Sequence, residues 1–169
     1  MKILLFGGAF DPPHRGHISI LKNAAAYKKF DKIIVMPTGT PTHKKSCTAP
    51  FDVRMYMSRT AFGDIADNIE ISDWEGTNLQ DDYTYRTLQH LMDEYDDAEI
   101  YMVIGSDSLF TLDKWKNAEF VMKNCTARVF AREDNIGEDM AQKAHQLKAM
   151  GAKIEFVDAE IINVSSSQF

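Results

Sequence analysis

Gly7-Gly8-Ala9-Phe10-Asp11-Pro12-Pro13-His14-Arg15-Gly16-His17 directly follows the first apolar run of the chain, residues 3–6. Its two adjacent glycines leave backbone N–H groups open to the close approach of a ligand. His14 and His17 are three residues apart, so on a helix they share one face. The first turn of a helix adds unpaired N–H groups and a partial positive charge. These features together predict an anion-binding site at a strand–helix junction.

Two other interpretations of His14 and His17 stay open at this point. They could be ordinary core or surface histidines, although their position beside Gly-Gly and Pro-Pro favours a function. They could also be metal ligands, but no third His or Cys stands nearby, and two histidines at this spacing are a weak signal. The loop matches neither the Gly-Lys-Ser/Thr phosphate loop nor the Gly-x-Gly-x-x-Gly dinucleotide loop.

Outward from this loop, short apolar runs alternate with amphipathic stretches. The runs that predict strands are residues 3–6, 33–36, 69–71, 100–104, 128–131 and 154–157. Stripes at helical spacing predict helices that carry Ile18, Leu21 and Ala25; Tyr85, Leu88, Leu91, Met92 and Tyr95; and Met140, Ala144 and Leu147, with Gly151 after the last. A further helix is expected over 51–62. This order predicts a single Rossmann-like α/β domain with a mostly parallel sheet and helices on both faces. Ligands of such sheets bind beyond the carboxyl ends of the strands.

Composition narrows the class of protein. The 169 residues are 44% hydrophobic and 26% charged, which is typical of a globular chain. The net charge of −6 argues against nucleic acid or an anionic membrane as a partner, so a bound phosphate must be held by a local cluster. Cys47 and Cys125 show neither disulfide nor metal spacing, and no apolar run approaches the roughly 20 residues of a membrane span. A cytoplasmic location is therefore expected.

Three further segments that follow predicted strands carry functional side chains. Residues 37–45 form a proline-punctuated loop with His43 and Lys44 at its tip, either a solvated loop or a basic flap over phosphates. Gly105-Ser106-Asp107 suits a ribose, with a glycine for close approach and a carboxylate for hydroxyls. Trp115 is either a packing residue or a stacking platform.

Residues 7–17 resemble the Gly-x-Phe-Asp-x-x-His-x-Gly-His signature of the nucleotidyltransferase superfamily. The whole chain is similar to bacterial nicotinate-nucleotide adenylyltransferases. Residues 41–44 resemble their Pro-Pro-His-Lys element, 105–115 their Gly-x-Asp-x₇-Trp, and 163–169 their Ile-Ser-Ser-Thr-x-Ile-Arg. Arg54 and Met57 match Arg-x-x-Met, although Arg54 could equally be a surface helix residue. Residues 82–87 resemble Ser-Tyr-Thr-x-Asp-Thr, with Arg86 in place of the acid.

The resemblance implies transfer of AMP from ATP to nicotinate mononucleotide, which gives deamido-NAD and pyrophosphate. It implies that His14, His17 and Lys44 are catalytic. The residues implied to bind ATP are Gly7, Gly8, Phe10, His14, His17, Gly105, Asp107, Arg132, Ser165 and Ser166. Those implied to bind the mononucleotide are His43, Lys44, Thr84, Trp115 and Lys116. Mg²⁺ is expected to bridge ATP phosphates with few or no direct protein ligands.

Two alternatives to this function stay open. One is another transferase of the superfamily, a phosphopantetheine adenylyltransferase or a cytidylyltransferase. The other is a non-catalytic homologue that binds a nucleotide without turnover. In either case residues 1–169 are expected to form one nucleotidyltransferase domain that lacks the usual C-terminal helical segment of the family.

Overall fold

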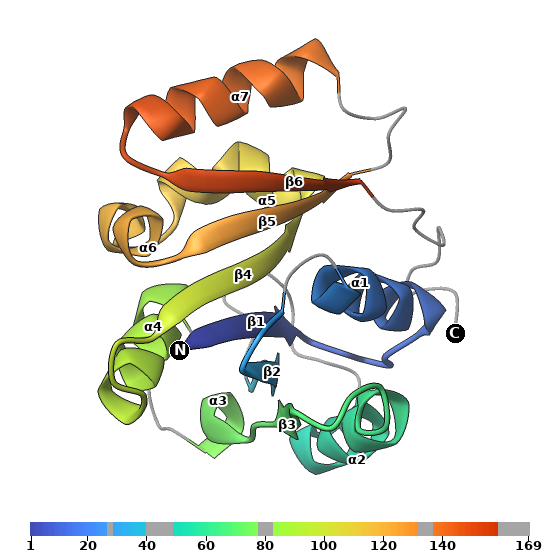
Figure 1. Cartoon of the computed structure of the whole chain (residues 1–169). Coiled ribbons are helices and arrows are strands. Elements are labelled where there is room, and N and C mark those ends of the chain that lie inside the picture. Colours follow the sequence, from blue (N-terminus) through green and yellow to red (C-terminus); the bar gives the residue numbers. More distant parts are fainter. Residues whose placement is uncertain (27–28, 40–48, 78–82, 132–136, 159–169) are drawn as a thin grey trace.

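The structure is a computed structural model that describes residues 1–26, 29–39, 49–77, 83–131 and 137–158. Six strands form one sheet in the order β3-β2-β1-β4-β5-β6, and every neighbouring pair is parallel (Figure 1). The strands are β1 (Lys2–Gly8), β2 (Lys32–Pro37), β3 (Ile69–Ile71), β4 (Glu99–Gly105), β5 (Thr126–Ala131) and β6 (Lys153–Asp158). The predicted Rossmann-like α/β fold is confirmed.

Helices cover both faces of the sheet (Figure 1). One face carries α1 (Arg15–Ala26) and α2 (Phe51–Phe62). The other carries α4 (Thr84–Glu94), α5 (Ser106–Thr111), α6 (Ala118–Asn124) and α7 (Glu138–Ala149). The short helix α3 (Trp74–Thr77) follows β3, and a 3₁₀ turn, η1 (Leu112–Lys114), follows α5.

Strand β1 shows why the predicted strands are continuously apolar. Ile3 and Leu5 belong to the cluster under α4 to α7, whereas Leu4 and Phe6 belong to the cluster under α1 and α2. Successive strand residues point to opposite faces, and both faces are covered here, so all four residues from Ile3 to Phe6 are buried. This packing places the carboxyl end of β1 in the middle of the sheet, beside β2 and β4.

The predicted stripe of α4 needs one correction. Leu88 and Leu91 are buried and Tyr85 packs against the same core, as does Tyr95 just after the helix, but Met92 is 39% exposed. Thr87 is also buried, and its hydroxyl has a hydrogen-bond partner.

The stripe predicted for α1 is confirmed. Leu21 is buried, Ile18 and Ala25 pack against the same core, and Ala24 is buried as well.

The prediction for α7 is confirmed. Its buried residues are Met140, Ala144 and Leu147. The helix ends at Ala149, and Gly151 follows with a φ of 102°. That left-handed conformation is the one that glycine adopts without strain after a helix.

Cys125 packs in the core, and its thiol donates to the carbonyl oxygen of Val121 at 3.2 Å. Burial raises the pKa of this thiol to about 12 from 9.0. The raised pKa adds stability that is fully present below pH 9.0 and is lost as the pH rises toward 12. In a Cys47→Ser variant we therefore expect Cys125 to react with a thiol reagent only after unfolding, since a protonated buried thiol is a poor nucleophile. Equal labelling rates in native and denaturing buffer would contradict this expectation.

Candidate active site

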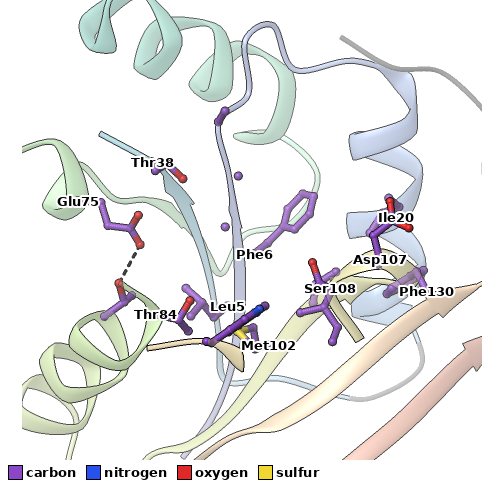
Figure 2. Close-up of a pocket in the computed structure, with 18 of the residues that line it drawn as sticks. Leu5, Phe6, Ile20, Thr38, Glu75, Thr84, Met102, Asp107, Ser108 and Phe130 are labelled. Carbon is purple, nitrogen blue, oxygen red and sulfur yellow. Dashed lines mark hydrogen bonds between the residues drawn. The ribbon is translucent and has the colours of Figure 1, made fainter. Parts of the chain in front are cut away.

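A cavity of about 730 Å³ opens at the carboxyl ends of β1 and β4 (Figure 2). The strand order reverses between these two strands, and the helices that follow them, α1 and α5, lie on opposite faces of the sheet. A crevice at such a switch point is the usual ligand site of an open parallel sheet. The predicted site residues that line this cavity are Gly7, Gly8, His17, Thr84, Gly105, Asp107, Trp115 and Lys116.

The remaining described residues of the prediction do not line this cavity. His14 stands just before α1, stacked on His17, and its catalytic role stays a prediction. Phe10 is 2% exposed, and its ring packs edge-on against Phe6, His17 and Phe62 at centroid distances of 5.3, 5.1 and 5.1 Å. The ring therefore supports the loop from the core, and the predicted role of Phe10 in binding ATP would fall to its backbone. Five predicted residues lie outside the described part of the chain: His43, Lys44, Arg132, Ser165 and Ser166.

The two histidines of the first loop form one stacked unit at the start of α1. Their ring centroids are 3.7 Å apart, with 18° between the planes. The N–H of Gly16 donates to Nδ1 of His14, and the N–H of His14 donates to Nδ1 of His17, both at 3.1 Å. A ring nitrogen that accepts a hydrogen bond carries no proton, so this pattern assigns the proton of each neutral ring to Nε2. Each imidazole can then donate one hydrogen bond from Nε2.

Burial lowers the pKa of His14 below its usual 6.5. A lowered pKa means that the neutral ring is stabilised above pH 6.5 and that this stability is lost as the pH falls through the folded pKa. We therefore expect kcat/KM to stay level from pH 6.5 into the mildly alkaline range and to fall on acidification, because a proton on Nδ1 displaces the Gly16 bond. The pH profile of kcat/KM measures this. If kcat/KM instead declines as the pH rises above 6.5, the expectation is wrong and catalysis depends on a cationic imidazole.

The carboxyl end of β4 is open to a ligand. β4 ends at Gly105, which precedes α5, and Asp107 lies in the first turn of that helix. Within the described residues, a Cβ at Gly105 would meet no atom within 4 Å, so none of them fills the space beside this glycine. Figure 2 shows Asp107 and Ser108 on one side of the cavity and Glu75 and Thr84 on the other.

The opposite wall comes from α3, α4 and the segment after α5. Thr87, which is 1% exposed, donates from its hydroxyl to Oε2 of Glu75 at 2.8 Å, and both residues line the cavity (Figure 2). Trp115 donates from Nε1 to Oγ1 of Thr111 at 3.2 Å, which fixes the orientation of its ring. α4 begins at Thr84 after Tyr83, and no side-chain cap bond is made there.

Sequence reasoning missed two features of the site. The Glu75–Thr87 bond joins residues twelve positions apart, and the only signal for it was the polar character of the segment after the third strand. Arg54 is 1% exposed, so the alternative of a surface arginine is wrong.

Comparison with known proteins agrees with this geometry. The model of the cytidylyltransferase-like family matches residues 5–169. A Clostridium novyi (strain NT) protein named probable nicotinate-nucleotide adenylyltransferase is 34% identical over 165 residues, which cover 96% of this chain and 82% of that protein. A Clostridium tetani protein of the same name is 34% identical over 169 residues, covering 99% of this chain and 84% of that protein.

The chain belongs to the nicotinate-nucleotide adenylyltransferases of the cytidylyltransferase-like family. The predicted family is thereby confirmed. A solved structure titled Plasmodium falciparum nicotinic acid mononucleotide adenylyltransferase complexed with NaAD has the same fold. It matches with a TM-score of 0.78 at 19% identity, and the match covers 99% of this chain and 81% of that one.

Within the described residues, His, Cys, Asp and Glu side chains form no group of three or more that could hold a metal ion. No helix in the same residues has the length and apolar character needed to cross a membrane.

Proposed function

We propose that this member of the nicotinate-nucleotide adenylyltransferases transfers AMP from ATP to nicotinate mononucleotide, giving deamido-NAD and pyrophosphate. The observation that carries the proposal is one cavity at the β1–β4 switch point, with Gly8 and His17 on its phosphate side and Thr84 and Trp115 on its other side. The names of the full-length relatives support the same reaction.

The reaction needs no nucleophile from the protein. The phosphate of the mononucleotide attacks the α-phosphorus of ATP, a P–O bond forms, and the bond to the pyrophosphate oxygen breaks on the opposite side. Catalysis of such a transfer is mainly positioning and stabilisation of charge. His17 donates from Nε2 to the phosphates, and the amino end of α1 adds the partial positive charge of a helix N-terminus.

The rest of the cavity would hold the two nucleosides. Gly105 and Asp107 would hold the adenosine ribose, and Trp115 would stack on the pyridine ring, whose carboxylate would face Thr84 and Lys116. The predicted roles of the residues outside the described part are proposed as well, with Lys44 and His43 over the phosphates, Arg132 at adenine, and Ser165 and Ser166 at the triphosphate.

A Mg²⁺ ion bound with ATP would neutralise part of the phosphate charge. Nδ1 of His14 and of His17 already accepts a backbone N–H and is not available to the ion. Since the described part of the chain also offers no group of three or more metal-ligating side chains, ATP and water would be its main ligands.

The test is a coupled pyrophosphate-release assay with mass-spectrometric detection of the dinucleotide. We expect release with ATP and nicotinate mononucleotide and a background rate without an acceptor. Higher release with phosphopantetheine, or with CTP in place of ATP, would move the protein to one of the other transferase activities. Binding of ATP without release from any acceptor would identify a non-catalytic homologue.

A further inference from the structure

Arg54 is the largest fully buried side chain of the described residues, and it does not line the cavity. It lies in the first turns of α2, beneath the loops that do. A guanidinium is costly to bury unless acceptors surround it. The hydrogen-bond acceptors of Arg54 therefore indicate its role.

Its acceptors are backbone carbonyl oxygens from three separate segments. Nη1 donates to Ala9 in the β1–α1 loop at 2.9 Å and to Thr38 after β2 at 2.6 Å. Nη2 donates to Gly39 at 3.2 Å, and Nε donates to Ala49, just before α2, at 3.1 Å. One side chain thus fixes the loops that follow two neighbouring strands, and Ala9 and Thr38 both line the cavity.

Two other bonds tie the same segments together. The N–H of Thr38 donates to the carbonyl of Gly8 at 2.8 Å, and the N–H of Ala49 donates to Oδ1 of Asp11 at 3.0 Å. These bonds hold the β1–α1 loop on either side of Ala9, the residue of this loop that Arg54 contacts. A change at Arg54 would act on this loop rather than on α2 alone.

The direction of the peptides gives the contact its functional meaning. In a trans peptide the carbonyl and the following N–H point in opposite directions. Because the carbonyls of Ala9 and Thr38 point at Arg54, the N–H groups of Phe10 and Gly39 point away from it. Backbone N–H groups attract a phosphate, and carbonyl oxygens repel it.

We propose that Arg54 is a positioning residue of the phosphate site. By holding the carbonyl oxygens of Ala9 and Thr38, it keeps them away from the triphosphate and leaves the N–H groups of Phe10 and Gly39 to bind it. This assignment rests on the proposed use of ATP at this site. It requires a planar, forked donor, since four carbonyls accept from three different nitrogens, and an ammonium group offers three N–H donors on a single nitrogen.

The first experiment compares Arg54→Lys with Arg59→Lys, a control on the exposed side of the same helix. Inorganic tripolyphosphate is titrated calorimetrically, and kcat and the KM for nicotinate mononucleotide are measured below the melting temperature of each variant. We expect Arg54→Lys to weaken tripolyphosphate binding by about tenfold, the scale of one charged hydrogen bond. We expect kcat to fall similarly with the mononucleotide KM unchanged, and Arg59→Lys to behave as the wild type.

Loss of thermal stability alone would overturn the proposal. If folded Arg54→Lys binds tripolyphosphate and turns over as the wild type does, then Arg54 only stabilises the fold. Wild-type protein that binds tripolyphosphate but does not adenylylate the mononucleotide would contradict the proposed function and leave this inference standing.

A second measurement uses the wild-type protein alone and so does not depend on whether a variant folds. Amide signals of the wild-type protein are followed by NMR during a tripolyphosphate titration. We expect the signals of Phe10 and Gly39 to shift to saturation, and those of the α7 helix to stay in place. Unshifted signals of Phe10 and Gly39 on binding would overturn the proposal.

Discussion

Replacing His17 by alanine is expected to lower kcat by about 10²–10³-fold, the usual effect of removing one donor at the site of developing charge. The ring lines the cavity, and its Nδ1 is occupied by the N–H of His14, so Nε2 is the donor that is lost. The melting temperature should fall by only a few degrees, because the change removes a backbone hydrogen bond, the stack on His14 and edge contacts with two phenylalanines, but no fully buried side chain. Steady-state kinetics and thermal unfolding of the same preparation measure both quantities.

The matched control is His145→Ala. His145 is exposed on α7, so the variant loses an imidazole far from the cavity. We expect wild-type kcat and melting temperature for it. Near-normal turnover of His17→Ala would show that His17 does not donate to the phosphates. Unfolding of the variant at ordinary temperature would show that the ring mainly serves packing.

The sheet was predictable because burial on both faces leaves an unbroken apolar run in each strand. The ends of the strands could not be predicted in this way. Gly7 and Gly8 continue β1 by pairing with Met36 and Pro37, although neither glycine has an apolar side chain that would signal a strand. Helices α5 and α6 carry no stripe long enough to detect. Their place is set by contacts such as those of Leu109 and Val121 with the core, which exist only after the sheet has formed.

The site was predictable where the chemistry is local in sequence. The loop with His14 and His17 could be interpreted because its glycines, its histidines and the helix start are adjacent. The role of the Phe10 ring could not be predicted, since the motif does not show whether the ring contacts the ligand or packs in the core. The acceptors of Arg54 come from residues 9, 38, 39 and 49, and no local pattern reports such a convergence.

The acceptor is expected to be used as the acid, with kcat/KM for nicotinate mononucleotide about 100-fold above that for the amide. α4 begins at Thr84, no side-chain cap is made there, and the first-turn N–H groups carry the positive end of the helix dipole beside the cavity. A pyridine carboxylate presents only acceptors to these donors. An amide sets its NH₂ against one of them, and an unpaired donor costs about 1–3 kcal/mol.

Glu75 allows this explanation of the selectivity to be tested, because its carboxylate lies on the same wall of the cavity and would favour the amide if it faced the pyridine ring. Its Oε2 accepts from the buried hydroxyl of Thr87, which directs that oxygen into α4 rather than toward a substrate. Glu75→Gln should therefore keep the preference for the acid, and its reduced negative charge should strengthen it. Equal kcat/KM for acid and amide in the wild type would contradict the helix-donor account. A preference for the amide that Glu75→Gln abolishes would show that Glu75 itself recognises the pyridine substituent.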